Sequence, residues 1–259
     1  MNSSEQNSVK NIFEQGTWYH SIDFQDVSSK GTFDYRNLVA KLNFPEMKDL
    51  SVLDVGCSDG FFTKYFLENL NAKFVTGIDF NKYDGTVAFE VLNSYSKDYE
   101  KKYDNQNDYT RLFEYYSDLG LKDSNKFLLL KKVFNLNADY KEGSIYELSN
   151  FDNHDVTFCG SLLEHLRDPI TAIEQLYLKT NKFCIIDVSN SFKNTLFSLR
   201  KPLLKYTSSG GNFYHYSLPV LKSMMENIGF KNVSVMKKYK IKIEKYGYKI
   251  PHIVIIGYR

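Results

Sequence analysis

The chain has 259 residues, of which 42% are hydrophobic and 25% charged, as in an ordinary globular protein. These proportions exclude a mainly disordered, collagen-like or membrane-embedded chain, and the length suits one large α/β domain with additions. The formal net charge of +2 gives no general attraction to nucleic acid or to an anionic membrane. Either partner would have to be bound by a local patch.

The predicted elements begin with an N-terminal cap, residues 1–48, in which a polar start is followed by aromatic segments at 17–24 and 31–42. From residue 49 onward, short apolar runs alternate with segments of helical period, the pattern of βαβ units in a parallel sheet. Strands are expected at 51–56, 73–80, 138–144, 155–160 and 183–189, and helices at 61–70, 169–180 and 217–230. Two β-rich segments, 233–243 and 251–258, suit an antiparallel pair at one edge of the sheet.

A tyrosine-rich, helix-prone segment at about 81–126 interrupts this pattern. It is longer than an ordinary connection, so we expect an insertion with its own helices. Two interpretations stay open. The insertion is either a lid over the functional site, or a surface addition that is inert or forms a homo-oligomer.

Three cysteines, Cys57, Cys159 and Cys184, lie in apolar segments without the paired spacing of a zinc site or a redox pair. We interpret them as free thiols in a reducing compartment. The first residues lack a basic start and an apolar run, and no stretch of about 18 apolar residues occurs. The sequence therefore predicts a cytoplasmic protein without membrane contact.

The most informative segment is 52–66, which reads as a strand, a loop and a helix, with Gly56, Ser58 and Gly60 in the loop. Small residues at this spacing let the backbone turn tightly and approach a ligand at the helix N-terminus. The letters G-x-S-x-G also match a hydrolase nucleophile elbow, in which Ser58 would attack a carbonyl, or a purely structural turn. Asp79 follows about 20 residues later, where a carboxylate can accept hydrogen bonds from ribose hydroxyls, and this favours a nucleoside cofactor.

Four motifs in the chain are similar to those of a known family: LDVGCSDG at 53–60, GIDF at 77–80, GSIYEL at 143–148 and GSLLEHLRDP at 160–169. In this order they resemble the class I S-adenosylmethionine-dependent methyltransferases, over about residues 50–259. The resemblance implies an α/β fold with a doubly wound, Rossmann-like, seven-stranded sheet, an antiparallel edge strand and S-adenosyl-L-methionine as cofactor. The late segment 214–230 is similar to the late helix of members that modify small molecules or sugars.

The resemblance also implies roles for single residues. Asp54 would accept from the cofactor's ammonium group and Asp79 would bind the ribose hydroxyls. Phe80 and Ile145 would enclose the adenine. Ser144 stands where many members have an aspartate, so its adenine contact would run through water or the backbone. The predicted cofactor-binding residues are Asp54, Gly56, Cys57, Ser58, Gly60, Asp79, Phe80, Ser144, Ile145, Gly160 and Ser161.

A closer resemblance lies in the cap, where WYHSIDF at 18–24 and GTFDYR at 31–36 precede the first motif. This arrangement is similar to bacterial methyltransferases related to the enzyme that completes a 5-oxyacetate modification on the wobble uridine of transfer RNA. That enzyme uses a carboxylated cofactor. Here Glu164 replaces the tyrosine of its pattern, and a carboxylate would repel the extra carboxylate, which favours ordinary S-adenosylmethionine.

Methyl transfer to a hydroxyl group needs positioning and a base that takes the proton. His165, after the fourth strand, and His20, in the cap, are the predicted catalytic residues. A helix-capping or backbone-bonded role is the alternative for His165, and His154 and His252 are interpreted as surface or strand histidines. Glu164 contacts cofactor or substrate, or else forms a salt bridge with Arg36 or Arg167. The predicted acceptor contacts are Trp18, Tyr19, Tyr35, Arg36, Glu164 and His215, and no metal site is predicted.

Segment 231–249 contains seven lysines and one glutamate, so it either follows RNA phosphates or forms an edge strand that lysines protect from aggregation. The favoured function is O-methylation of a small polar metabolite, sugar or natural-product intermediate. One alternative is methylation of a modified transfer RNA wobble uridine. Another is a catalytically silent scaffold that binds the cofactor.

Overall fold

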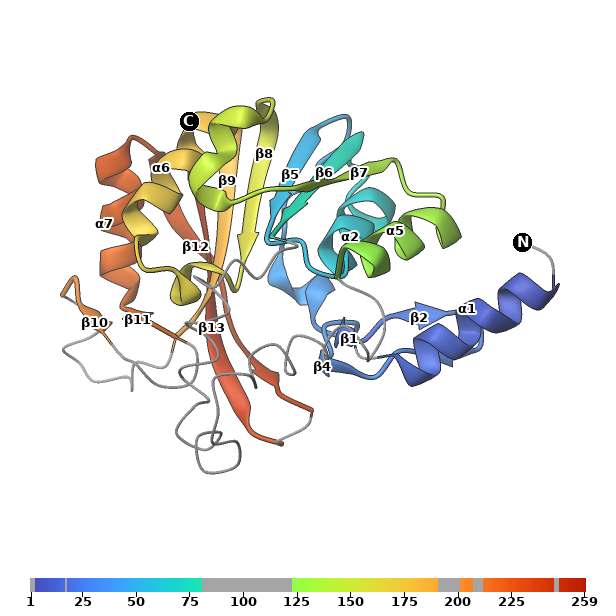
Figure 1. Ribbon diagram of the computed structural model, residues 1–259. Coiled ribbons are helices and arrows are strands. Elements are labelled where there is room, and N and C mark those ends of the chain that lie inside the picture. The colour runs from blue at the N-terminus through green and yellow to red at the C-terminus, as the bar shows by residue number, and fades with distance from the viewer. Residues whose placement is uncertain (1–2, 17, 81–122, 191–200, 207–211, 245–246) are drawn as a thin grey trace, which may run out of the picture.

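The computed structural model describes residues 3–16, 18–80, 123–190, 201–206, 212–244 and 247–259 (Figure 1). Its centre is a seven-stranded sheet of order β12-β13-β9-β8-β5-β6-β7. These strands are β5 (Ser51–Val55), β6 (Phe74–Asp79), β7 (Ala138–Glu142), β8 (His154–Gly160), β9 (Thr180–Ser189), β12 (Lys231–Lys242) and β13 (Lys249–Tyr258). Strands β5 to β9 are parallel, whereas β13 is antiparallel to both of its neighbours. The predicted α/β sheet and the antiparallel pair at its edge are confirmed, and the reversed strand lies one position in from the edge.

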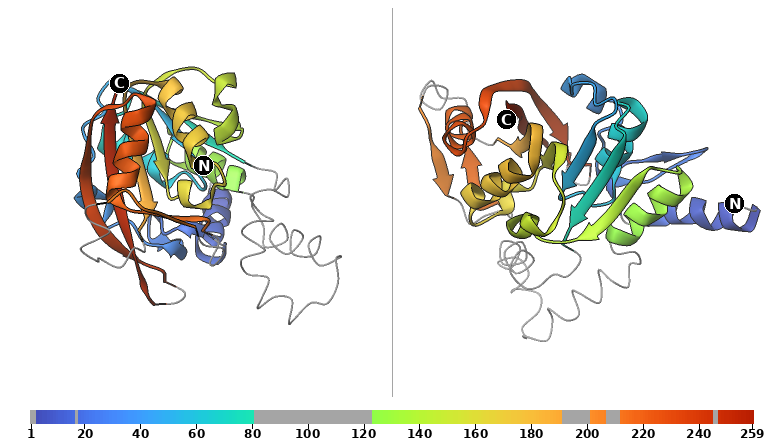
Figure 2. Two further views of the ribbon diagram at one scale, coloured as in Figure 1. Left: turned by 90° about the vertical axis from the view of Figure 1, so that its left-hand side faces the viewer. Right: turned by 90° about the horizontal axis from the view of Figure 1, so that it is seen from above.

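Helices cover both faces of this sheet (Figure 2). On one face lie α2 (Phe61–Asn69) and α5 (Asp123–Val133), and on the other lie α6 (Pro169–Lys179) and α7 (Leu218–Ile228). Successive side chains of a strand point to opposite faces, so Val52 belongs to the first core cluster and Leu53 to the second. The order β5-α2-β6 followed by β8-α6-β9 on the other face is the doubly wound arrangement.

Capping residues fix where two of these helices begin. Asp168 accepts a hydrogen bond from the backbone N–H of Thr171 at the start of α6. Ser217 accepts one from Val220 at the start of α7. In both helices a proline occupies the first turn, where its missing N–H costs nothing. The predicted helix starts therefore follow from local sequence.

The N-terminal segment packs beside α2 and α5 (Figure 1). It contains α1 (Ser3–Gln15), the parallel pair β1 (Trp18–His20) and β4 (Gly31–Phe33), the hairpin of β2 (Asp23–Phe24) and β3 (Val27–Ser28), and the 3-10 helix η1 (Val39–Leu42). Phe13 stacks on Trp18 and Phe24, and Phe24 contacts the Phe134 ring beyond α5. This segment shares one core cluster with the main sheet. The division into a cap at 1–48 and a main domain at 49–259 stays a prediction.

The remaining elements follow the carboxyl ends of β7, β8 and β9. They are η2 (Ile145–Asn150), η3 (Leu163–His165), β10 (Leu204–Tyr206) and β11 (Tyr214–Tyr216), the last two forming a small antiparallel pair. Nearly all of the predicted insertion at 81–126 lies outside the described residues. Within the described ranges, no helix has the length and apolar character needed to cross a bilayer.

Candidate active site

The loop between β5 and α2 turns sharply at the carboxyl end of the sheet. Gly56 and Gly60 have φ angles of 79° and 87°, in the left-handed region that favours glycine. A side chain at Gly60 would also meet the Phe127 ring at 2.9 Å. Gly56 N donates to Ile78 O at 2.8 Å, and Ser58 N donates to the Asp79 carboxylate at 2.6 Å. The loop is thereby held against the end of β6.

Asp79 occupies the position that sequence reasoning assigned to a ribose-binding carboxylate. It is half-buried, and its second oxygen accepts from Phe80 N at 2.7 Å. The Phe80 side chain is exposed beside it. Gly143 N donates to the Asp79 carbonyl, which brings the next motif alongside. There Ser144 caps η2 by accepting from Tyr146 N, and Ile145 is buried. The predicted ribose and adenine residues therefore gather at the ends of β6 and β7.

Asp54 is fully enclosed behind the glycine loop. Its carboxylate accepts a hydrogen bond from the Thr63 hydroxyl at 2.6 Å. Burial raises the pKa of Asp54 to about 7, and the negative charges of Asp79 and Asp59 act in the same direction. A cation placed here would stabilise the ionised carboxylate. The loop is thus chemically suited to a ligand that carries positive charge.

His20 in β1 is joined directly to the glycine loop. Its ring Nδ1 lies 2.6 Å from one Asp59 oxygen, and its backbone N–H donates to the other at 2.8 Å. The His20 ring stacks on Phe61, the first residue of α2, at a centroid distance of 5.1 Å. Burial acts to raise the pKa of Asp59, but the charge and hydrogen bonds of His20 outweigh it and hold the pKa below its usual value. An ionised Asp59 therefore orients His20.

A second group of buried polar side chains lies where β9, β12 and β13 meet the cap. Asp187 accepts a hydrogen bond from the Tyr239 hydroxyl, and its other oxygen lies 3.1 Å from Nδ1 of His252. The Tyr239 hydroxyl also lies 3.1 Å from that of Tyr35. Burial, reinforced by the charge of Asp187, raises the pKa of both tyrosines well above the usual value, so both hydroxyls stay protonated.

Most of this second group was missed by sequence reasoning, which named only Tyr35 as a site residue and interpreted His252 as a surface or strand histidine. Asp187 and Tyr239 are 52 positions apart and meet only because β13 lies between their strands. His252 is the buried strand histidine of β13. Burial acts to lower the pKa of His252, but the charge and hydrogen bond of Asp187 outweigh it and raise that pKa. Only the FCIIDVS pattern, an aspartate at the end of an apolar strand, offered a signal.

Glu164 and His165 occupy η3, directly after β8. Glu164 is buried, and its Oε1 accepts from the Ser189 backbone N–H at 2.9 Å. His165 is half-buried, and its backbone N–H donates to Leu162 O. Ser161 N donates to the Asp187 carbonyl at 2.8 Å, which draws the start of this loop toward β9.

The predicted acceptor residues do not all lie together. Tyr19 and Tyr35 contact the His20 ring. Trp18 is buried within the N-terminal segment, where its indole N–H donates to Ile12 O at 3.1 Å. Arg36 pairs with Asp34 at 2.6 Å and with Asp23.

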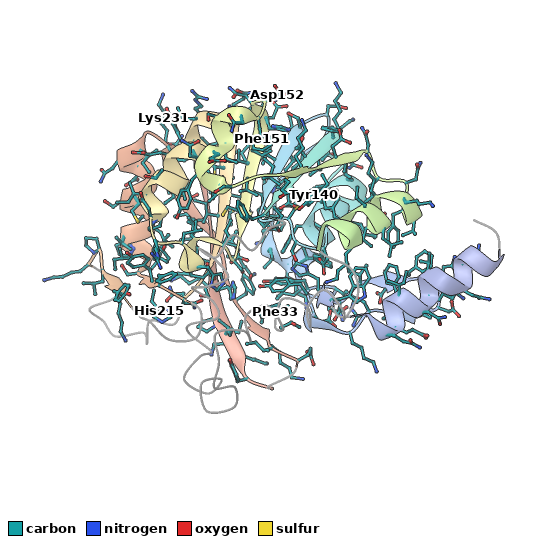
Figure 3. All side chains as sticks on the ribbon, viewed as in Figure 1. Phe33, Tyr140, Phe151, Asp152, His215 and Lys231 are labelled. Carbon is teal, nitrogen blue, oxygen red and sulfur yellow. The ribbon has the colours of Figure 1, made fainter. Side chains whose placement is uncertain are left out.

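His215 lies apart from them, in β11 (Figure 3), and its buried Nδ1 finds no hydrogen-bond partner among the described residues. Within the described residues, no group of three or more His, Cys, Asp or Glu side chains is placed to hold a metal ion.

Comparison with known families assigns this fold and site to a class. A profile of the methyltransferase domain matches residues 32–235, so the chain belongs to this methyltransferase family. No curated protein matches the chain. The predicted subgroup of transfer RNA-modifying enzymes stays a prediction.

Three solved structures share the fold. The N-terminal domain of EvdMO1, determined in the presence of S-adenosylhomocysteine and D-fucose, has a TM-score of 0.62 and 13% identity, over 100% of this chain and 97% of that one. The 1,6-didemethyltoxoflavin-N1-methyltransferase of Burkholderia thailandensis has a TM-score of 0.50 and 15% identity, over 86% of this chain and 75% of its own. The magnesium protoporphyrin IX methyltransferase of Synechocystis PCC 6803 has the same score and identity, over 86% and 78%.

Proposed function

We propose that this protein transfers a methyl group from S-adenosylmethionine to a hydroxyl oxygen of a small polar metabolite, sugar or natural-product intermediate. The observation that carries the proposal is the glycine loop, which begins after the buried Asp54, is bonded to Asp79 through Ser58 N, and holds His20 through its own Asp59. Nucleoside binding and proton transfer therefore have candidate groups at one loop. The D-fucose named with the EvdMO1 domain supports a small, hydroxylated acceptor.

The chain's own residues fit such a cofactor, which when bound supplies an electrophilic methyl group on a sulfonium. Asp54 would hold the ammonium group, and its environment disfavours a carboxylate without a cationic partner. The backbone of 56–60 would lie beneath the amino-acid part, with Cys57 and Ser58 in the turn and Gly160 and Ser161 facing it from the end of β8. Asp79 would accept from the ribose hydroxyls.

His20 is the favoured base because Asp59 fixes its orientation. If the Asp59 carboxylate accepts the proton of Nδ1, the other ring nitrogen, Nε2, is left to accept a proton from the acceptor hydroxyl. His165, in η3 directly after β8, is the second candidate. The direct test is incubation with methyl-labelled S-adenosylmethionine and a panel of sugars and other polyols. The proposal predicts a labelled O-methyl ether in the product.

Cofactor affinity is expected to depend on pH through Asp54. Because the pKa of Asp54 in the free protein is about 7, lowering the pH through 7 protonates the carboxylate that the ammonium group needs. S-adenosylhomocysteine should therefore bind more tightly at pH 8 than at pH 6, with a limiting slope of about tenfold per pH unit below 7. Calorimetry across this range measures the effect. In Asp54→Asn the affinity should be weak and nearly independent of pH, and an unchanged slope in this variant would contradict the role of Asp54.

The alternative acceptor, transfer RNA, is kept because of β12. This edge strand exposes Lys238, Lys240 and Lys242 at alternate positions, although Lys242 also pairs with Glu244 at 2.9 Å. We expect these lysines to protect the edge, so binding of bulk transfer RNA should be weak and should vanish near physiological salt. A gel-shift salt titration measures this. Tight binding with a steep salt dependence, lost when the three lysines are replaced, would promote the transfer RNA acceptor over the small molecule.

A further inference from the structure

Glu164 is a buried carboxylate whose hydrogen bonding is incomplete. The residue is only 2% exposed, and Oε1 accepts from Ser189 N. Its other oxygen, Oε2, is shielded from solvent and has no hydrogen-bond partner in the described ranges of the chain. A buried carboxylate oxygen without a donor is costly, and native proteins seldom keep one without a functional reason.

The surroundings of Glu164 make this oxygen more unusual. Three carboxylates, those of Glu164, Asp54 and Asp187, lie close enough to Cys159 near the end of β8 to act on its thiol. Burial raises the pKa of that thiol most, and Cys184 and the three carboxylates raise it further. Each of the other two has side-chain hydrogen-bond donors. Asp54 accepts from Thr63, whereas Asp187 has Tyr239 and His252.

Arginine does not compensate the charge of Glu164 from the cap, since the Arg36 guanidinium is engaged by Asp34 and Asp23. His215 does not supply a positive charge that would balance Glu164 either. Burial lowers the pKa of His215, and the charge of Lys205 lowers it further, although Glu164 acts to raise it. The ring is therefore mostly neutral at pH 7. The charge of Glu164 also acts on His252, but the His252 ring is bonded to Asp187, so Oε2 of Glu164 still has no donor among the described residues.

Location connects Glu164 with the acceptor. It follows β8 by four residues, at the same end of the sheet as the glycine loop, and its carbonyl accepts from the N–H of Phe213, the residue before β11. Ligands in open α/β sheets bind outside the carboxyl ends of the strands. Ser189, the residue that holds Oε1, is the last residue of β9 at that same end.

We propose that Oε2 of Glu164 accepts a hydrogen bond from a hydroxyl or ammonium group of the methyl acceptor, and that it excludes acceptors with a carboxylate or phosphate at that position. The proposal rests on the proposed function and specifies its substrate class as neutral or cationic. A hydroxyl or ammonium donor satisfies the orphan oxygen. An anionic group would instead meet a second negative charge in a site of low dielectric, which is strongly unfavourable.

The test uses three sugars of one ring configuration that differ in charge: D-fucose, D-galactosamine and D-galacturonate. Their binding to the full-length protein saturated with S-adenosylhomocysteine is measured by calorimetry and saturation-transfer NMR. We expect D-fucose and D-galactosamine to bind at least about tenfold more tightly than D-galacturonate. In Glu164→Gln, whose amide can keep the Ser189 contact and present N–H donors, this preference should fall by about tenfold or more. An unchanged preference, or wild-type binding of D-galacturonate as tight as that of the other two, would overturn the proposal.

Two measurements separate this role from a structural one. If Glu164 serves binding at the expense of stability, Glu164→Gln should raise the melting temperature of the free protein by about 2–4 °C. A structural Glu164 would lower it. Glu164→Asp keeps the charge on a shorter side chain, so it should weaken D-fucose binding yet still exclude D-galacturonate. Glu174→Gln removes an exposed carboxylate from α6 and should change neither quantity.

Failure of this inference is distinguishable from failure of the proposed function. If the wild-type protein does not bind S-adenosylhomocysteine, the proposed function is wrong. If it binds the cofactor product but neither D-fucose nor D-galactosamine, only the role of Glu164 is overturned. Cofactor affinity in Glu164→Gln should stay within about threefold of wild type, because the carboxylate contacts the acceptor and not the cofactor.

Discussion

Replacement of Asp79 by alanine is expected to weaken binding of S-adenosylhomocysteine by about 1–3 kcal/mol, which is roughly a 5- to 150-fold increase in Kd. Two losses combine. The ribose hydroxyls lose their acceptor, and the Ser58 and Phe80 backbone N–H groups, now bonded at 2.6 and 2.7 Å, lose theirs. Because Ser58 lies in the glycine loop, the backbone beneath the cofactor also loses its anchor. Calorimetry on the purified variant measures the change.

Asp139→Ala is the matched control for Asp79→Ala. Asp139 lies on the neighbouring strand β7, where it forms an exposed salt bridge with Lys131. Its removal should cost little stability and should leave cofactor affinity within about twofold of wild type. Equal effects of the two substitutions would show that Asp79 has no special role in binding the nucleoside.

His20→Ala is expected to lower kcat by roughly 10²-fold or more, because the base is lost from the transition state. Asp59→Asn should also lower kcat, since the amide no longer holds His20 in the orientation seen here, while KM for S-adenosylmethionine changes much less. Both constants are measured with an acceptor found in the labelled-methyl screen. A rise in KM with unchanged kcat would instead make the His20–Asp59 pair a structural link between the cap and the glycine loop.

Alanine variants of two further histidines serve as comparisons for His20→Ala. His165→Ala decides between the two candidate bases, and we expect a smaller loss of kcat than for His20→Ala. His154 is a buried histidine at the opposite end of the sheet, bonded to Thr76 at 2.8 Å. His154→Ala should lower stability without lowering kcat. A larger loss in His165→Ala than in His20→Ala would transfer the role of base to His165.

The sheet was predictable because its signals are local. Apolar runs mark β5 and β8, and the helices expected at 61–70, 169–180 and 217–230 are found at Phe61–Asn69, Pro169–Lys179 and Leu218–Ile228. The glycine loop was predictable for the same reason, since its motif is confined to residues 53–60. Asp79 was found from the strand that precedes it.

The rest of the site depends on contacts distant in sequence. The bond between Asp187 and Tyr239 requires the strand order β12-β13-β9, and the pairing of His20 with Asp59 requires the cap to dock beside α2. Arg36 looked available in the sequence, yet two nearby aspartates bind it. Charge patterns within one segment do not indicate which partner a folded chain brings close. The predicted insertion at 81–126 falls mostly outside the described residues and stays a prediction.

The central claim, a cofactor site for S-adenosylmethionine at the glycine loop, is tested most directly by calorimetry of the wild-type protein with S-adenosylhomocysteine and, separately, with NAD. Both ligands carry an adenosine, so Asp79 alone does not distinguish them. Asp54 does, because its carboxylate suits an ammonium group and repels a pyrophosphate. We predict binding of one S-adenosylhomocysteine per chain and no measurable binding of NAD. Binding of NAD without binding of S-adenosylhomocysteine would contradict the account.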